Sequence, residues 1–141
     1  MGRAVIEDLL SASHEVKVLV RKSSEVLPWV IEQVVVGDLA DLDLTHFGGL
    51  LIEAFKGFEV VVHTAARVHI MNDDAFDPLT EFRNVNRDAT LLLARLAAQS
   101  GVKRFVFLSS IKVNGELTTP GNPFTPDDEY VPNDPYGLSK Y

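Results

Sequence analysis

The chain has 141 residues, 46% of them hydrophobic, which suits one domain with a buried core and excludes global disorder. Its net charge of -7 argues against a general affinity for nucleic acid or an anionic membrane surface, because both require clustered lysine and arginine. The absence of cysteine excludes disulfides and thiolate metal sites, and fits the reducing cytoplasm in which we expect the protein to work.

The first part of the chain predicts a helix, two strands and a second helix. From Gly2, the stretch GRAVIEDLLSAS places apolar residues on one face of an amphipathic helix. The stretch EVKVLVRK at 15–22 alternates valine with other residues and predicts a strand. The stretch VIEQVVVGDL at 30–39 predicts a strand that ends near Gly37, and THFGGLLIEAFKGF at 45–58 predicts a short helix that stops at its last glycine.

The second part predicts two more strands, a long helix and a long loop. The stretch EVVVHTAA at 59–66 is uniformly apolar at its strand positions, as is typical of a parallel strand with both faces covered. The stretch at 77–101 predicts a long helix closed by its final glycine, and KRFVFLSS at 103–110 predicts a fourth strand. Residues 111–135 are rich in proline, glycine and aspartate and predict a loop, after which a helix begins near Pro135.

Strands and helices alternate along the chain, which predicts an α/β fold with a parallel sheet and right-handed crossovers. In a doubly wound sheet the first unit normally begins with a strand, whereas here a helix comes first. We therefore expect a Rossmann-like, doubly wound parallel sheet that is truncated at both ends. Residues 1–141 would form one partial dinucleotide-binding domain without a substrate domain.

The last helix carries a tyrosine and a lysine at catalytic spacing. Tyr136 and Lys140 are four residues apart, so they share one face of a helix. A phenol has a pKa of about 10 and becomes a useful base near neutral pH only beside a cation. A tyrosine and a lysine on an exposed helix surface could have the same spacing. The pair therefore indicates a catalytic site only if neighbouring segments also carry residues suited to a ligand.

That context is a set of strand ends with residues suited to a ligand. Open α/β sheets bind ligands at the carboxyl ends of their strands. Ser109 and Ser110 lie at the carboxyl end of the predicted strand at 103–110, where a serine hydroxyl can bind a substrate hydroxyl or cap the strand. Asp38 and Leu39 lie at the end of a second predicted strand, and the small residues Ala65 and Ala66 lie at the end of a third. Together these strand ends predict a ligand site on one rim of the sheet.

With these segments in this order, the sequence resembles the extended short-chain dehydrogenases/reductases, in particular the nucleotide-sugar epimerases and dehydratases. The similar segments are VVVGDL, VVHTAARVH, NVNRDAT, RFVFLSSIKVNGE and PYGLSK, in the order and at about the spacing of the family. The resemblance extends over essentially all 141 residues. The combination is specific, although no segment is specific by itself.

The resemblance implies a catalytic set of Ser110, Tyr136 and Lys140. Tyr136 matches the base of the family, and Lys140 matches the lysine that lowers the pKa of the phenol and holds the nicotinamide ribose. Ser110 matches the catalytic serine or threonine. The implied reaction removes a proton from a sugar hydroxyl while hydride passes to the nicotinamide.

The resemblance also implies the residues that bind the cofactor, and Tyr136 and Lys140 belong to both sets. Asp38 and Leu39 match residues around the adenine, and Ala65 and Ala66 match the loop beside the phosphates and ribose. Gly2 matches the last glycine of the dinucleotide fingerprint, where it would allow close packing of helix and strand. Asn86 matches a helix asparagine that steadies the neighbouring strand.

In the family, a further strand lies between the counterparts of the strands at 15–22 and 59–66. A chain without it leaves two valine-rich strand edges unpaired, which favours association with other chains. We therefore expect residues 1–141 by themselves to be marginally stable and inactive, and to bind NAD(P) weakly. A homodimer is a candidate assembly.

The residues after the first predicted strand favour NADP over NAD. NAD-binding members usually have an acidic residue there, whereas this chain has Arg21, Lys22 and Ser23. A guanidinium suits a 2′-phosphate because its planar fork binds phosphate oxygens in pairs. Arg21 could instead stack on adenine or face solvent.

The resemblance favours a nucleotide-sugar epimerase, dehydratase or reductase, and two other functions stay open. A reductase or dehydrogenase of a steroid-like alcohol would share the same segments. A dinucleotide-binding sensor without turnover would keep the fold but would not need the serine, tyrosine and lysine together. We predict no metal site, because the four histidines have no metal-ligand spacing: His14, His46, His63 and His69. His63, in an apolar strand, is interpreted as a core histidine with a hydrogen-bond partner.

Overall fold

The computed structural model describes residues 1–28, 30–68 and 76–141. Trp29 and His69 lie outside these residues. In chain order the elements are α1 (Gly2–Ser11), β1 (Lys17–Val20), β2 (Glu32–Val35), the 3-10 helix η1 (Leu39–Asp41), α2 (Leu44–Phe55), β3 (Val60–His63), α3 (Pro78–Arg83), the π-helix η2 (Asn84–Asp88), α4 (Ala89–Gln99), β4 (Arg104–Phe107), the 3-10 helix η3 (Ile111–Val113) and α5 (Pro135–Lys140). The predicted alternation of strands and helices is confirmed.

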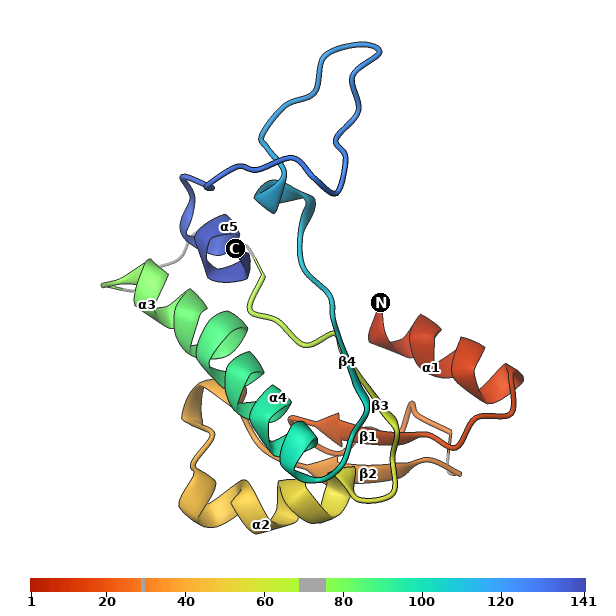
Figure 1. The fold of residues 1–141 in the computed structure, drawn as a ribbon. Coiled ribbons are helices and arrows are strands. Elements are labelled where there is room, and N and C mark those ends of the chain that lie inside the picture. Colours follow the sequence, from red (N-terminus) through yellow and green to blue (C-terminus); the bar gives the residue numbers. More distant parts are fainter. Residues whose placement is uncertain (29, 69–75) are drawn as a thin grey trace.

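The strands form two parallel pairs, as expected for an α/β fold. Strand β1 pairs with β2, and β3 pairs with β4. Within the described residues the two pairs are separate sheets, so β1 and β3 are not hydrogen-bonded neighbours. Figure 1 shows α1 and α2 on opposite sides of the β1–β2 pair, which is the arrangement of a doubly wound fold.

The hydrophobic core lies between the strands and the helices α2 and α4. Leu51 of α2 is fully buried there, and burial of a leucine side chain stabilises a fold by about 2 kcal/mol. The other buried members of this cluster are Val34, Val36, Ala54, Phe55, Leu93, Leu96 and Ala97. Leu19, Val61 and Phe105 pack against it from three strands, so α2 and α4 connect the two strand pairs.

The expectation that both faces of the third strand are covered is wrong. Val60 and Val62 remain 48% and 39% exposed, because a cavity separates this face of β3 from α1. Helix α1 has no buried residue, and its apolar side chains Val5, Ile6 and Leu9 line the same cavity. The amphipathic face that the sequence predicts therefore faces a hollow instead of a packed sheet.

The long helix predicted at 77–101 is one helical run with a wider turn inside it. Asp77 caps its start by accepting a hydrogen bond from the Thr80 amide, and the run ends at Gln99, two residues before Gly101, whose φ is 86°. Between α3 and α4 the chain forms the π-helix η2, an irregularity often found at functional sites. No helix in the described ranges has the length and apolar character needed to cross a membrane.

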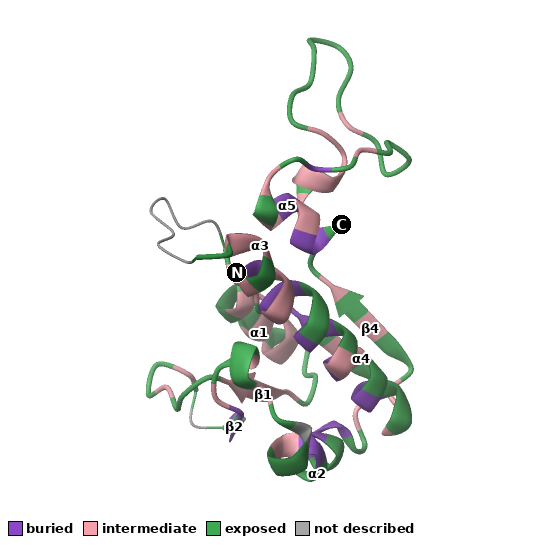
Figure 2. Ribbon diagram, turned by 90° about the vertical axis from the view of Figure 1, so that its left-hand side faces the viewer, coloured by how far each residue is buried: buried purple, intermediate pink, exposed green. Residues whose placement is uncertain are grey.

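The proline-rich loop after η3 projects away from the rest of the chain (Figure 1). Figure 2 shows most of this loop as exposed, whereas α5 behind it carries buried residues. Inside the loop, the Thr125 amide donates to Asp128 at 2.7 Å and the Asn114 side chain donates to the Thr125 carbonyl at 3.0 Å. The loop returns to the body of the molecule at Asp134, where α5 begins.

Candidate active site

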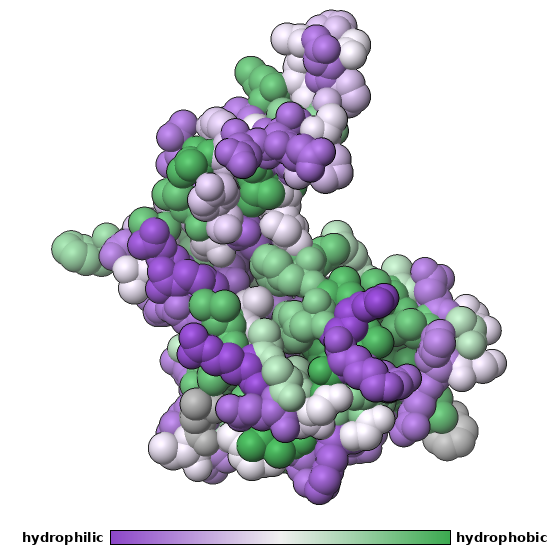
Figure 3. All heavy atoms as spheres, viewed as in Figure 1, coloured by the Kyte–Doolittle hydropathy of each residue, from purple (hydrophilic) through white to green (hydrophobic). Residues whose placement is uncertain are grey.

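A cavity of about 950 Å³ lies between α1, β1 and β3. In Figure 3, which has the same orientation as Figure 1, hydrophobic side chains gather on this face with hydrophilic ones around them. The lining includes six of the residues predicted to bind a cofactor, namely Gly2, Arg21, Asp38, Leu39, Ala65 and Ala66. They come from α1 and from segments that follow β1, β2 and β3, so the fold brings distant parts of the chain to one cavity.

Helix α1 starts at this cavity with features that suit a phosphate group. A Cβ at Gly2 would lie 3.1 Å from Oγ1 of Thr64, so glycine allows the helix to approach the segment after β3. The first turn of α1 carries no acidic residue, and no side chain caps it. Its backbone amides and the positive end of the helix dipole therefore stay available to an anion such as a pyrophosphate.

Asp38, one of the two predicted adenine-side residues, forms an ion pair with Arg21. A carboxylate oxygen of Asp38 is 3.7 Å from a guanidinium nitrogen of Arg21, and both side chains are exposed. Asp38 also accepts a hydrogen bond from the Ala40 amide at 3.0 Å, which caps η1 and fixes the carboxylate near the mouth of the cavity. The Arg21 guanidinium is therefore held next to an acid, a neighbour that the sequence did not reveal.

Asn86 fastens the segment that follows β3. Its side-chain oxygen accepts from the Arg67 amide at 2.8 Å, and its side-chain nitrogen donates to the Arg67 carbonyl at 2.9 Å. The segment with Ala65 and Ala66 is thus tied to the π-helix. The asparagine steadies the residues just after the strand, and it also donates to Ser139 of α5 at 2.9 Å.

None of the three predicted catalytic residues lines this cavity: Ser110 follows β4, and Tyr136 and Lys140 lie on α5, which contacts the end of β4 through Lys140. Nζ of Lys140 donates to the Leu108 carbonyl at 3.2 Å and lies 4.5 Å from the centre of the Phe107 ring. Ser109 donates a hydrogen bond to the Lys140 carbonyl at 3.3 Å, so the end of α5 contacts the residues that follow β4. Burial lowers the pKa of Lys140 below that of a free ammonium.

Tyr136 and Lys140 both lie in α5, as their spacing predicts. The Tyr136 ring is half-buried and contacts Phe82 of α3 edge-on, with 6.0 Å between the ring centres. Oγ of Ser110 accepts a hydrogen bond from the Lys112 amide at 3.3 Å, which caps η3. Helix α5 and η3 are in contact, so Ser110 stands on a segment that touches the helix of Tyr136.

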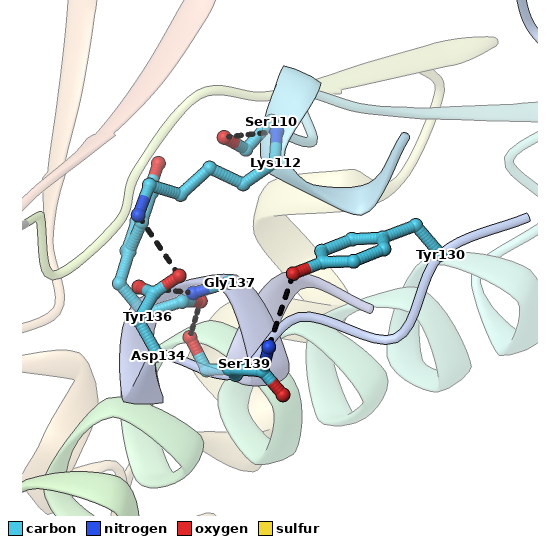
Figure 4. A network of polar contacts seen from close by, with 8 residues as sticks. Ser110, Lys112, Tyr130, Asp134, Tyr136, Gly137 and Ser139 are labelled. Atoms are coloured by element: carbon cyan, nitrogen blue, oxygen red, sulfur yellow. Dashed lines mark hydrogen bonds and ion pairs between the residues drawn. The ribbon is translucent and has the colours of Figure 1, made fainter. Parts of the chain in front are cut away.

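An ion pair between Lys112 and Asp134 joins these two segments (Figure 4). Nζ of Lys112 lies 2.9 Å from one carboxylate oxygen of Asp134, and the other oxygen accepts from the Gly137 amide at 3.0 Å. The hydrogen bond to Asp134 raises the pKa of Lys112. Although burial of Asp134 opposes ionisation, hydrogen bonds from Gly137 and Lys112 hold its pKa below the usual range.

Sequence reasoning missed this ion pair. The Asn-Asp-Pro segment before α5 signals a helix N-cap, but nothing in it indicates a partner 22 residues earlier.

His63 is the core histidine that the sequence suggested. It is buried, its Nε2 lies 2.9 Å from Oγ1 of Thr90, and its ring stacks beside Phe107. Burial, with the nearby Lys140 charge, lowers the pKa of His63 to about 4, so the imidazole is neutral at physiological pH. Within residues 1–28, 30–68 and 76–141, no three histidine or acidic side chains form a group that could hold a metal ion.

Comparisons with known proteins identify the family and the fold of the chain. A family model described as "NAD dependent epimerase/dehydratase family" matches residues 1–141. A UDP-glucose 4-epimerase from Vibrio cholerae is 56% identical over 85 residues, which are 60% of this chain and 26% of that protein. A decarboxylating sterol-4-alpha-carboxylate 3-dehydrogenase from Dictyostelium discoideum is 32% identical over 97% of this chain and 40% of that protein.

A solved structure has the same fold over nearly the whole chain. A short-chain dehydrogenase/reductase superfamily protein from Agrobacterium tumefaciens with bound NAD superposes with a TM-score of 0.75 and 33% identity. The match covers 99% of this chain and 38% of that one, so the chain spans well under half the length of the relatives it matches. Its parallel α/β fold and its match along all 141 residues lead to one conclusion: the chain belongs to the NAD dependent epimerase/dehydratase family.

Proposed function

We propose that the protein carrying this chain is a nicotinamide-dependent oxidoreductase of the epimerase/dehydratase type that acts on a nucleotide-activated sugar. The observation that carries the proposal is the placement of Lys140 and Tyr136. Both lie on α5, and Lys140 fastens this helix to the end of β4, where Ser110 follows. Strand ends of this kind are where open α/β sheets bind their ligands.

In this proposal Tyr136 removes a proton from a sugar hydroxyl and Ser110 holds the same oxygen by a hydrogen bond. The Lys140 ammonium, one turn further along α5, favours the phenolate form of the tyrosine. Burial of Lys140 strengthens this interaction, because charges are screened less where water is excluded. The side chains of this chain therefore supply the proton transfer and the positioning of the substrate.

The described residues fit a nicotinamide dinucleotide. The uncapped start of α1, which approaches Thr64 through Gly2, would hold the pyrophosphate. Asp38 and Leu39 would lie at the adenine, and Ala65 and Ala66 would lie along the phosphates and ribose.

At the other end of the cofactor, Tyr136 and Lys140 would face the nicotinamide ribose, while Asn86 keeps the segment after β3 in place. When bound, the cofactor supplies hydride acceptance and return. Six of the predicted cofactor-binding residues line the cavity, Tyr136 and Lys140 lie on α5, and Asn86 lies in the π-helix η2.

Arg21 favours NADP over NAD in this proposal. Its guanidinium lies at the mouth of the cavity, after β1, where a 2′-phosphate could bind it in a bidentate manner. Asp38 beside it opposes this preference by neutralising part of the charge. We propose that this protein binds NADP more tightly than NAD, although the similar Agrobacterium structure holds NAD.

A second candidate function is oxidation of a secondary alcohol on a steroid-like substrate. It is favoured by the similarity to a sterol carboxylate dehydrogenase, which extends over 97% of this chain. The nucleotide-sugar proposal takes precedence because the similarity to a UDP-glucose 4-epimerase reaches 56% identity. The serine, tyrosine and lysine would act in the same way on either substrate.

The test uses the intact protein with UDP-glucose and with a sterol alcohol, each with NAD and NADP. Turnover of the sugar nucleotide is expected, and Tyr136→Phe should lower kcat at least a hundredfold while cofactor affinity stays within threefold. Tyr130→Phe is the matched control, because Tyr130 lies in the exposed loop and its hydroxyl contacts Asn133. Near-normal turnover by Tyr136→Phe rules out the proposed base, and turnover of the sterol alone selects the second candidate.

A further inference from the structure

The buried side chain of Ser139 lies between the proposed cofactor segment and the proposed catalytic helix. Only 4% of the residue is exposed, and its hydroxyl contacts two groups. Oγ accepts a hydrogen bond from the Asn86 side chain at 2.9 Å and donates to the Tyr136 carbonyl at 2.7 Å. Figure 4 shows the second of these bonds, inside the turn of α5 that carries Tyr136.

The direction of every hydrogen bond in this network is fixed by its neighbours. The Arg67 amide can only donate, so it must face the Asn86 oxygen, and the Arg67 carbonyl can only accept. The second hydrogen of the Asn86 side-chain nitrogen is therefore directed at Ser139. Because the serine oxygen accepts that hydrogen, its own proton is left for the Tyr136 carbonyl.

Asn86 has little freedom to rearrange. It is 1% exposed and lies in the π-helix η2, between the segment after β3 and helix α5. Its two bonds to Arg67 hold it in place even without Ser139. Loss of the serine hydroxyl would leave one buried N–H of Asn86 without this partner, which is unfavourable in a site that water does not reach.

Other contacts hold the start of α5, its tyrosine and its last residue, whereas Ser139 joins the helix to Asn86. At the start, Asp134 caps the helix, and Gly137 admits Pro132, because a Cβ there would lie 2.5 Å from the Pro132 ring. At the end, Lys140 rests on the Leu108 carbonyl. The bond from Asn86 to Ser139 is a polar contact between α5 and the π-helix, and the same asparagine binds the segment after β3.

We propose that Ser139 is a positioning residue that, through Asn86, aligns the Tyr136–Lys140 face of α5 with the cofactor segment at Ala65–Arg67. This inference rests on the proposed function. A misplacement of about 1 Å in a catalytic group can lower turnover about a hundredfold. Removal of the hydroxyl should therefore affect turnover far more than cofactor binding, since the Asn86–Arg67 bonds remain.

The experiment compares Ser139→Ala and Ser139→Thr with wild type in the intact protein. Turnover is measured with UDP-glucose, affinity by calorimetric titration with NAD and NADP, and folding by thermal unfolding. Ser139→Ala should lower kcat tenfold or more with cofactor Kd within threefold, and Ser139→Thr, which keeps the hydroxyl, should recover most of the loss. Ser100→Ala is the matched control, because Ser100 also donates to a carbonyl of its own helix, at 2.8 Å, but lies far along the chain at the end of α4.

A double-mutant comparison and a readout without turnover complete the test. In an Asn86→Ala background, Ser139→Ala should change kcat less than threefold, because the serine acts through the asparagine. Hydrogen exchange of the α5 amides should accelerate in Ser139→Ala but not in Ser100→Ala. A kcat within twofold of wild type, or equal effects in both backgrounds, overturns the proposal.

If wild type turns over no sugar nucleotide or sterol, the proposed function fails, and the exchange measurement decides the role of Ser139 by itself. Unchanged α5 exchange in Ser139→Ala then overturns the positioning role as well. Accelerated exchange of the α5 amides in that variant would support the role of the Ser139 hydroxyl in ordering this helix.

Discussion

Lys112 and Asp134 form an ion pair of 2.9 Å that joins the 3-10 helix after Ser110 to the first turn of α5. The same carboxylate also caps α5 through the Gly137 amide. Asp134 therefore has two separable roles, one in starting the helix and one in holding η3 beside it. The Asp134 carboxylate is thus one of the groups that connect the segment of the proposed serine to the helix of the proposed tyrosine.

The first prediction separates these two roles. Asp134→Ala removes the cap and the ion pair and should lower the free energy of unfolding by about 1–2 kcal/mol. Lys112→Met removes only a partly exposed ion pair and should cost less than about 1 kcal/mol. Urea unfolding of both variants measures the difference, and an equal or larger loss for Lys112→Met would show that the cap contributes little.

The second prediction concerns the cofactor 2′ position. Arg21→Gln should raise the Kd for NADP about tenfold or more, because a charge-assisted hydrogen bond contributes about 1.5–3 kcal/mol. The Kd for NAD should change less than threefold. Calorimetric titration of the intact protein measures both, with Lys22→Gln as the neighbouring control. Tighter binding of NAD than of NADP by wild type would contradict the preference directly.

The third prediction concerns pH and His63. Its pKa falls from about 6.5 in the unfolded chain to about 4 in the fold, so the folded protein binds fewer protons between these values. The stability associated with the neutral imidazole is complete above pH 6.5 and is lost as the pH falls towards 4. Between pH 7 and pH 5 this loss should be about 2 kcal/mol.

Urea unfolding at both pH values tests the role of His63, with His63→Gln as the comparison. Glutamine can still hydrogen-bond Thr90 but does not titrate, so its stability should fall by about 2 kcal/mol less over the same interval. Parallel pH dependence in the two proteins would mean that the imidazole is not the group responsible.

The fourth prediction concerns association of residues 1–141. Strands β1 and β3 each pair on one side within the described residues, and Val60 and Val62 expose apolar surface at the cavity. Such strands favour pairing with other chains. Sedimentation of this 141-residue chain should show concentration-dependent association, and Val62→Lys should weaken it at least fivefold.

Leu117→Lys is the matched control for that measurement. Leu117 is exposed in the projecting loop, so the same change of charge occurs away from the strands. Equal weakening by both substitutions would attribute the effect to net charge, and a strictly monomeric wild type would remove the basis of the candidate homodimer.

The sequence by itself determined the elements and the family. Valine runs, the caps at Asp77 and Asp134 and the glycine at 101 are local signals, because each depends on residues within a few positions along the chain. They correctly indicated the four strands, the helices and a tyrosine and lysine on one helix. The family followed from the order of short segments, which also needs no knowledge of contacts.

Only the tertiary structure decided which distant groups meet. The separation of β1 from β3, the cavity between them, the Lys112–Asp134 pair and the Asn86–Ser139 bond all join residues far apart in sequence. Periodicity reports which face of an element is apolar, but it carries no information about which partner that face or side chain will contact. A buried hydroxyl such as that of Ser139 acquires its role only when packing removes water and leaves two specific partners within reach.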